Sequence, residues 1–193
     1  MKSLLKIFAV IIFLGLLGTL VPRSQDQKMS SEAYNLNEEA SDLHSAGKYA
    51  EALPLYKRAL AIREKTLGPE HPEVATSLNN LAELYRVQGK YAEALPLYKR
   101  SLDIFEKALG PEDPDVALSL NNLALLYDAQ GKYAEALPLF ERSLAIWEKA
   151  LGPEHPNIAT SLNNLAVLYR NTGRIEEAEV LERRAAKILA IPR

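Results

Sequence analysis

Residues 47–56 read Gly-Lys-Tyr-Ala-Glu-Ala-Leu-Pro-Leu-Tyr, and this stretch decides the fold because it returns almost unchanged along the chain. It recurs at 89–98 and, with Phe in the last place, at 131–140, and a weakened copy opens at Gly173, so the period is a constant 42 residues. A fixed period of this length is typical of a solenoid, in which each repeat is a small unit stacked on the next. The repeat therefore has to be understood before any single residue.

Each period contains two helices. In the second period four apolar residues fall at i, i+3, i+4 and i+7: Leu78, Leu81, Ala82 and Tyr85. This spacing places them on one face of a helix expected over 72–88, and the same period predicts a second helix over 91–109. Residues 89–90 leave room only for a tight turn, so we expect an antiparallel hairpin.

Glycine and proline mark the helix ends. Residues 109–114 read Leu-Gly-Pro-Glu-Asp-Pro, and 67–72 and 151–156 repeat this pattern with His in place of Asp. Glycine suits the left-handed residue that ends a helix, and the second proline suits the first position of the next one. We expect the Asp or His between them to be the N-cap. A local bend is expected at the prolines inside the second helices: Pro54, Pro96 and Pro138.

The second period resembles the tetratricopeptide repeat, whose signature appears here as Leu78-x2-Leu81-Ala82-x2-Tyr85 followed by Ala94-x3-Tyr98. The Leu-Asn-Asn-Leu-Ala and Leu-Gly-Pro motifs and the longer period are similar to the 42-residue repeats of kinesin light chains and their bacterial relatives. The resemblance implies an all-α, right-handed α-solenoid of about four helix hairpins over 31–191. The expected hairpins are 31–71, 72–113, 114–155 and 156–191.

Both ends of the array depart from the repeat pattern. In the first repeat Glu39 and Asp42 stand where the second repeat has leucine. In the last repeat Glu179 and Glu182 replace a leucine and an aromatic residue. A terminal repeat has one face without a neighbour, so acidic residues there are expected to keep the array soluble and finite.

The first residues differ in composition from the rest. Lys2 and Lys6 precede an uncharged, nearly all-apolar run over 7–21, which is the layout of an export signal. Residues 1–22 fit a cleaved signal peptide or a retained membrane anchor, and the lack of a small-residue cleavage pair favours the anchor over the signal peptide. A buried core helix is disfavoured because neither face of the run carries charge. The lysines favour a cytoplasmic N-terminus, which would put the repeats outside the cytoplasm, on the periplasmic or extracellular side. Residues 23–30 are polar and predict a short tether.

Composition excludes several classes of function. The 193 residues carry a net charge of −2 and no basic stretch, so nucleic acid is not an expected partner. There is no cysteine, and therefore no disulfide or thiolate site. Of the three histidines, His71 and His155 are two repeats apart, too far to share a metal. Phosphate-loop, hydrolase and zinc-protease motifs are absent, so we expect no catalytic residue, no cofactor and no metal.

The resemblance implies that partner segments lie along the first helix of each hairpin, which lines the concave face. One asparagine keeps register there through all repeats: Asn37, Asn79, Asn121 and Asn163. Asparagine is a poor helix former, so its recurrence asks for a reason. One hypothesis is a ladder of amides that bonds the backbone of an extended peptide, and the alternative is that the amides bridge neighbouring first helices or ordered water. Packing or capping is favoured for the asparagines that follow: Asn80, Asn122 and Asn164.

Between the asparagines the lining varies from repeat to repeat, and this variation would set specificity. The candidate groove residues there are Glu83, Arg86, Leu125, Asp128, Val167 and Arg170. Trp147 is expected to be partly exposed, where it could make a second contact. The sequence thus predicts a non-catalytic scaffold that binds a protein or peptide segment. The alternatives are a structural or self-associating module and an accessory subunit of a membrane complex.

Overall fold

The computed structural model describes residues 25–191, whose regular structure is entirely helical. Residues 25–45 form the first helix. It is followed by α2 (Tyr49–Leu67), α3 (Pro72–Val87), α4 (Tyr91–Leu109), α5 (Pro114–Ala129), α6 (Tyr133–Leu151), α7 (Pro156–Asn171) and α8 (Ile175–Leu189). The chain divides into two compact units, Met1–Pro69 and Glu70–Arg193. The second unit holds α3 to α8.

The helix ends fall where the glycines and prolines predict them. Pro72 opens α3 and Leu109 closes α4, as expected. In the turn between these helices Gly89 has a φ of +71°, a conformation that glycine adopts without a steric penalty. The backbone N–H of Lys90 then donates to the carbonyl of Tyr85 at 2.9 Å, which closes the turn.

Side chains cap the N-termini of α3, α5 and α7. The Asp113 carboxylate accepts from the backbone N–H two residues later at 2.9 Å. His71 and His155 accept through Nδ1 from the equivalent N–H groups, each at 3.2 Å. Two of the three histidines therefore have a structural role, as the sequence predicts.

The second helix of each early hairpin continues through its proline, at Pro54 in α2, Pro96 in α4 and Pro138 in α6. A proline inside a helix removes one backbone hydrogen bond. All three prolines lie on exposed faces, where water can bond the carbonyl that loses its donor. The helices are therefore unbroken, and a local bend within them stays a prediction.

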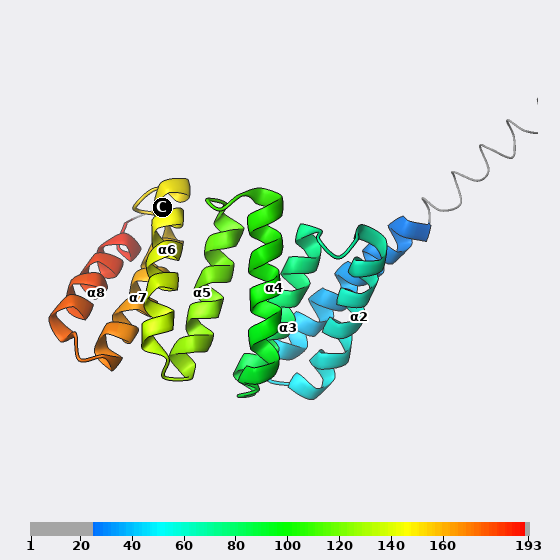
Figure 1. Ribbon diagram of the computed structural model, residues 1–193, viewed down its shortest axis with the longest axis horizontal. Coiled ribbons are helices and arrows are strands. Elements are labelled where there is room, and N and C mark those ends of the chain that lie inside the picture. The colour runs from blue at the N-terminus through cyan, green and yellow to red at the C-terminus, as the bar shows by residue number, and fades with distance from the viewer. Residues whose placement is uncertain (1–24, 192–193) are drawn as a thin grey trace, which may run out of the picture. The chain divides into compact units, whose positions relative to one another are not determined.

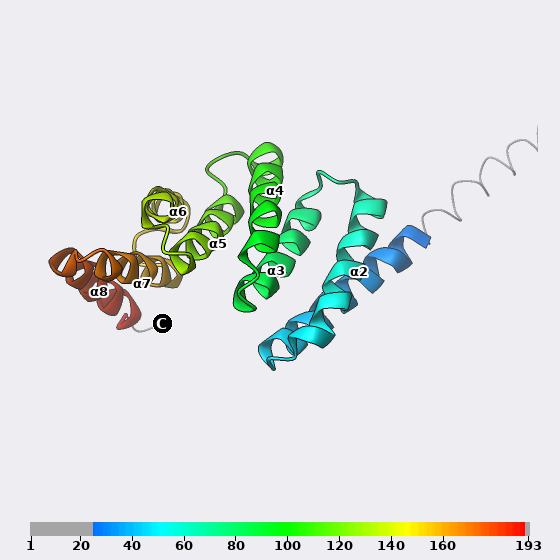
Figure 2. The same ribbon diagram turned by 60° about the horizontal axis from the view of Figure 1, so that its bottom comes forward.

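In the Glu70–Arg193 unit the six helices form three hairpins: α3 with α4, α5 with α6 and α7 with α8. Neighbouring hairpins contact each other through α4 with α5 and α6 with α7, and the first helices also touch, α3 with α5 and α5 with α7. The turns lie at alternating ends (Figure 1), and the turned view shows the same succession (Figure 2). The predicted stack of helix hairpins is confirmed in this unit.

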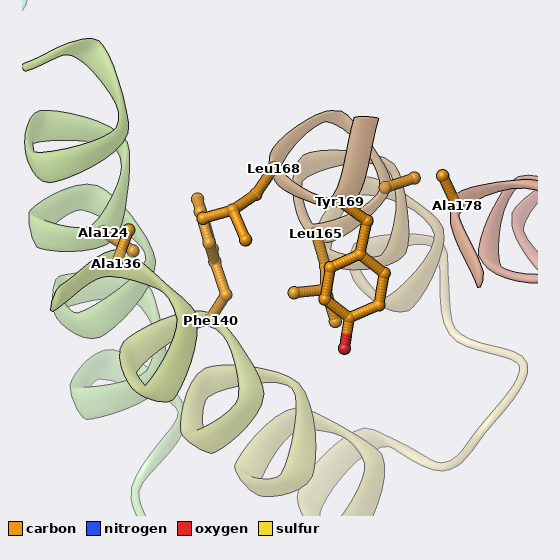
Figure 3. Packing of buried hydrophobic residues seen from close by; sticks show 8 residues of the cluster. Ala124, Ala136, Phe140, Leu165, Leu168, Tyr169 and Ala178 are labelled. Carbon is orange, nitrogen blue, oxygen red and sulfur yellow. The ribbon is translucent and has the colours of Figure 1, made fainter. Parts of the chain in front are cut away.

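The core of this unit lies between successive hairpins. Phe140 of α6 is 1% exposed and points toward Leu168 of the next hairpin (Figure 3). Leu165 and Tyr169 of α7 belong to the same cluster. A buried side chain of this size contributes about 1.5–3 kcal/mol, so each hairpin depends on its neighbour for part of its stability.

Two buried serines tie the second helix of a hairpin to the first. Ser101 donates its hydroxyl hydrogen to the carbonyl of Ala75, and Ser143 donates to that of Ala117, each at 2.7 Å. These pairs are one period apart, so the same contact is built twice. It satisfies a hydroxyl that would otherwise be buried without a partner.

Trp147 is a correction to the sequence prediction. Its side chain is only 6% exposed, and its indole N–H donates to the carbonyl of Pro114 at 3.2 Å. The ring therefore packs against the start of α5 in its own hairpin, because that loop supplies an acceptor for the indole. No second contact surface is available at this tryptophan.

In the Met1–Pro69 unit the helix over 25–45 contacts α2. The Arg58 side chain bonds Glu32, and the ring of His44 lies edge-on to that of Tyr56, with centroids 6.4 Å apart. Residues 25–30, which were expected to belong to a polar tether, are already helical, and Ser31 donates to the carbonyl of Gln27 at 2.9 Å. The polar residues of this stretch therefore lie on a helix.

Three of the four acidic residues expected at the ends of the array are exposed, whereas Glu182 is half-buried and bonds Arg170, and α8 also exposes Val180 and Leu189. Glu39 and Asp42 are exposed on the first helix or lie at its surface, and Glu179 is exposed on α8. The signal or anchor expected over 1–22 lies outside the described residues. From residue 25 to 191, no helix combines the length and the apolar character that crossing a membrane requires.

Candidate functional site

The candidate surface lies on α3, α5 and α7, the first helices of the three hairpins. Side chains at i, i+4, i+7 and i+11 share one side of a helix, and in these three helices none of the side chains on that side is buried. We call this surface the stripe. It comprises Thr76, Asn80, Glu83 and Val87 of α3, Leu118, Asn122, Leu125 and Ala129 of α5, and Thr160, Asn164, Val167 and Asn171 of α7.

The stripe runs through the second asparagine of each pair. Asn79 and Asn121 are only 5% and 6% exposed, whereas the asparagines that follow them are half-buried. This burial corrects the expected exposure of Asn79 and Asn121. Asn163 is exposed, and Asn37 in the other unit is half-buried.

Hydrogen bonds across the helix seams account for the burial. The Asn79 amide nitrogen donates to the Ser119 hydroxyl at 2.9 Å, joining α3 to α5. The Asn164 amide nitrogen donates to the Asn121 carbonyl oxygen at 2.9 Å, joining α7 to α5. The alternative in which the amides bridge neighbouring first helices describes both contacts. A peptide-binding role for the asparagine column stays a prediction.

Glu83 and Arg86 of α3 form a closed network with Tyr98 of α4. Two guanidinium nitrogens of Arg86 donate to the two carboxylate oxygens of Glu83 at 2.7 and 2.6 Å. The Tyr98 hydroxyl donates to the same carboxylate at 2.7 Å. Burial and the neighbouring Glu83 raise the pKa of Tyr98 well above its usual value, so the phenol stays a neutral donor. The hydrogen bond to Glu83 likewise raises the pKa of Arg86.

One period later, this network is replaced as a whole. Leu125 stands in the place of Glu83, Asp128 in that of Arg86 and Phe140 in that of Tyr98. This hairpin therefore lacks both the glutamate carboxylate and the tyrosine hydroxyl that donates to it. Asp128 is half-buried and accepts one long hydrogen bond, from the Asn171 amide at 3.4 Å. Among residues 25–191 it forms no ion pair.

The last hairpin uses a third arrangement. Val167 occupies the place of Glu83, and Arg170 donates from two guanidinium nitrogens to Glu182 of α8, at 2.8 and 2.7 Å. The hydrogen bond from Arg170 lowers the pKa of Glu182. Glu182 stands at the position that Tyr98 occupies in the α3–α4 hairpin. The carboxylate that bonds the arginine is therefore on the second helix of this hairpin, whereas in the α3–α4 hairpin it is on the first. The charge of Arg170 is balanced inside its own hairpin.

The stripe carries large apolar side chains only on α5 and α7, among polar ones, apart from Val87 at the end of α3. On α5, Leu118 is 43% exposed and Leu125, two turns later, is half-buried. On α7, Val167 is 50% exposed. The corresponding positions of α3 carry Thr76 and Glu83. One part of the surface therefore offers an ion pair and the other offers hydrocarbon.

The described part of the chain does not assemble a metal centre. No group of three histidine, aspartate or glutamate side chains between residues 25 and 191 could hold a metal ion. His71 and His155 are used as helix caps, and the ring of His44 lies against Tyr49 and Tyr56.

Sequence reasoning missed the link between Tyr98 and the candidate groove residues. The signal was present, since tyrosine accompanies glutamate in one repeat and phenylalanine accompanies leucine in the next. Both pairs keep the same 15-residue separation. A comparison of the repeats position by position would have identified them as one cluster.

Comparison with known proteins identifies the repeats. The tetratricopeptide repeat family model matches residues 31–107, 73–149 and 115–190, which together span most of the chain. The chain belongs to the tetratricopeptide repeat family. Among curated proteins no sequence matches it.

Solved structures similar to this tetratricopeptide repeat protein include kinesin light chain-like proteins. A crystal structure of BtubC (BKLC) from P. vanneervenii is 27% identical, with a TM-score of 0.73, and the match covers 83% of this chain and 67% of that one. A putative kinesin light chain from Podosopora anserina with nearly identical TPR-like repeats is 34% identical, with a TM-score of 0.66, and the match covers 83% of this chain and 76% of that one. A point variant of the same Podosopora anserina protein has a TM-score of 0.68 at the same identity. Tetratricopeptide repeats are generally scaffolds for protein–protein interaction.

Proposed function

We propose that this chain is a non-catalytic scaffold that binds a segment of a partner protein along the stripe of α3, α5 and α7. One observation carries the proposal: the residue types on the stripe change from repeat to repeat, whereas the buried residues on the same helices do not. One fully buried position is leucine in all three helices, at Leu78, Leu120 and Leu162. The stripe position five residues later is Glu, Leu and then Val. An identical residue at a buried position serves packing, whereas variation at one position that solvent can reach suits recognition of a specific partner.

The chemistry of the stripe fits a peptide-like segment. Asn122 and Asn164 are half-buried on it and bond Asn121 between them, Asn164 as donor and Asn122 as acceptor. Each amide retains a further N–H and acceptor capacity, so it can also donate to a carbonyl and accept from an N–H of a peptide. Exposed Leu118 and Val167 lie on the same two helices and can bury apolar side chains of a partner. Backbone recognition by the amides combined with side-chain recognition beside them is a common mode of peptide binding.

The test is selection of random linear peptides, displayed on phage, against the full chain. Binding of the recovered peptides is then measured by fluorescence anisotropy on two matched variants. Val167→Asp places a charge in the stripe, and Val180→Asp makes the same change at an exposed valine on α8, outside it. Because the two valines are 50% and 56% exposed, both variants should fold, and helical circular dichroism checks this.

The proposal expects Val167→Asp to weaken binding at least tenfold and Val180→Asp to leave it unchanged. Equal effects of the two substitutions, or binding that neither of them alters, would contradict the stripe as the binding surface. Recovery of no binding peptide would also contradict it.

A second candidate function, self-association through α8, is favoured by one observation. Leu189 is 62% exposed, whereas the residues one and two periods earlier, Trp147 and Phe105, are 6% and 3% exposed. Against this, Glu179 and Glu182 stand where α4 and α6 bury apolar or aromatic side chains. Light scattering of the wild type and of Leu189→Ser across concentration separates the two functions. A monomer at all concentrations removes the second candidate.

The proposed location of the repeats, outside the cytoplasm, rests only on the composition of residues 1–22. A fusion of the full chain to alkaline phosphatase, which is active only after export, tests it. An inactive fusion that is made in normal amounts would contradict the location without bearing on the stripe.

A further inference from the structure

The stripe consists of two parts that differ in how charge is balanced. On α3, Glu83 and Arg86 neutralise each other with two short hydrogen bonds. On α5 and α7 the stripe carries Leu118, Leu125 and Val167, and the carboxylate of Asp128, one turn beyond Leu125 at the edge of the stripe, forms no ion pair among residues 25–191. This asymmetry concerns residues at matching repeat positions, so it is a property of the side chains and not of the helix geometry.

The cations near Asp128 are engaged elsewhere. Arg170, at the matching position of α7, is held by both oxygens of Glu182. Lys132 lies over the ring of Tyr127, 6.0 Å from its centroid, and Arg174 bonds Glu177. From the described residues, 25–191, Asp128 itself receives only the long hydrogen bond from Asn171. A half-buried carboxylate in this situation attracts a cation from a partner, because low exposure strengthens the interaction.

We propose that the α5–α7 part of the stripe binds a partner segment in which apolar side chains lie beside a lysine or arginine. The apolar side chains contact Leu118, Leu125 and Val167, and the cation bonds Asp128. This inference rests on the proposed function, and it adds the chemistry of the partner. The complementary charge favours a basic segment over an acidic one.

The spacing along α5 defines the segment further. Leu118 and Leu125 are two helical turns apart, about 10 Å along the helix axis. An extended chain covers about 10 Å in three residues. Asp128 follows one turn later, about 5 Å further on. A segment running parallel to α5 would therefore carry apolar residues three positions apart and a basic residue one or two positions after the second.

The experiment extends the peptide selection to variants that alter only the charge. Asp128→Asn keeps the shape and the acceptor for Asn171 but removes the charge. Glu141→Gln is the matched control, since Glu141 is an exposed carboxylate on α6 of the same hairpin and lies outside the stripe. Anisotropy titrations at low and high salt measure how much each carboxylate charge contributes to the affinity for the peptide.

A third variant copies the network of one repeat into the next. Leu125→Glu, Asp128→Arg and Phe140→Tyr together give the α5–α6 hairpin the cluster that α3 and α4 already contain. The chain itself shows that this combination packs in a hairpin of this type. The variant should remain helical while it loses the apolar and acidic surface.

The inference expects recovered peptides to carry a lysine or arginine next to apolar residues. Their affinity should fall about tenfold in Asp128→Asn and in the triple variant and remain unchanged in Glu141→Gln, and high salt should abolish the difference between wild type and Asp128→Asn. Peptides that are lost with Val167→Asp but have no basic residue, or that tolerate Asp128→Asn, would overturn the inference and leave the proposed function intact. Peptides that Val167→Asp does not affect would overturn both.

Discussion

The α3–α4 and α5–α6 hairpins are built alike, and among the positions at which they differ is one linked cluster. Both have a 16-residue first helix, a 19-residue second helix and a serine that bonds the same carbonyl position. They differ where Glu83, Arg86 and Tyr98 give way to Leu125, Asp128 and Phe140. The fold therefore keeps the buried leucines of the first helices constant, while a small linked group of side chains, one of them buried on the second helix, changes from one hairpin to the next.

The members of the cluster depend on each other for a physical reason. The Tyr98 hydroxyl reaches the Glu83 carboxylate from the neighbouring helix. With leucine in place of the glutamate, such a hydroxyl would lose its acceptor, and phenylalanine removes that cost. The pairs Tyr–Glu and Phe–Leu are therefore each self-consistent, whereas a mixture of the two is not.

The largest expected effect comes from breaking what the two hairpins share. Leu120→Ala removes a fully buried side chain at a position that is leucine in each hairpin of the second unit. Loss of a buried leucine leaves a cavity and costs about 2–5 kcal/mol. Urea unfolding, followed by helical circular dichroism, should show this loss.

Leu118→Ala, two residues away, is the matched control. This leucine is 43% exposed, so its removal should change the unfolding free energy by less than about 1 kcal/mol. If the two substitutions were equally destabilising, the distinction between a buried position that stabilises the fold and a stripe position that does not would be incorrect.

A smaller effect is expected from mixing the two clusters. Tyr98→Phe removes a hydrogen bond to a charged group and should cost about 1.5 kcal/mol. Phe140→Tyr should also destabilise, by about 1 kcal/mol, because the new hydroxyl meets Leu125 instead of a carboxylate. Urea unfolding of both variants measures these changes.

A mutant cycle that treats Leu125→Glu with Asp128→Arg as one change and Phe140→Tyr as the other measures the coupling within the cluster. Adding Leu125→Glu and Asp128→Arg to Phe140→Tyr should restore the stability that the tyrosine alone removes. Additive effects, with no recovery in the combined variant, would show that the three positions do not act as a cluster.

Much of this fold could be predicted because its signals are local. The period sets the repeat, and glycine and proline set the helix ends to within a residue, as Pro72 and Gly89 show. The phase of the stripe could not be predicted. Moving from Asn79 to Asn80 rotates the direction of a side chain by about 100°, and asparagine is compatible with either a buried bridge or an exposed surface.

The other differences between the structure and the sequence-based predictions depend on contacts between residues far apart in the sequence. Asn79 is buried because Ser119, one repeat away, accepts its hydrogen bond. Trp147 is buried because the carbonyl of Pro114 accepts from its indole. Pro114 belongs to the motif that opens a helix, but that motif does not indicate a bond to an indole, so only the packing of the helices reveals either contact.

The smallest expected effect concerns the third variant of the cluster, Arg170 with Glu182. The pKa of Glu182 is lowered in the folded chain by its hydrogen bond with Arg170. A carboxyl with a depressed folded pKa stabilises the fold above its unfolded pKa, and this contribution is lost as the pH falls through the lower folded value. Because both side chains are exposed, the contribution should be small and salt-sensitive.

Glu182→Gln tests this pair. The variant should melt slightly below the wild type at neutral pH, and the two should melt alike in acid, where the wild-type carboxyl is protonated. Glu141→Gln controls for the change in net charge, since Glu141 forms no ion pair among residues 25–191. A melting difference that persisted in acid would mean that Glu182 stabilises α8 by packing, and the three hairpins would then differ in more than how they balance one charge.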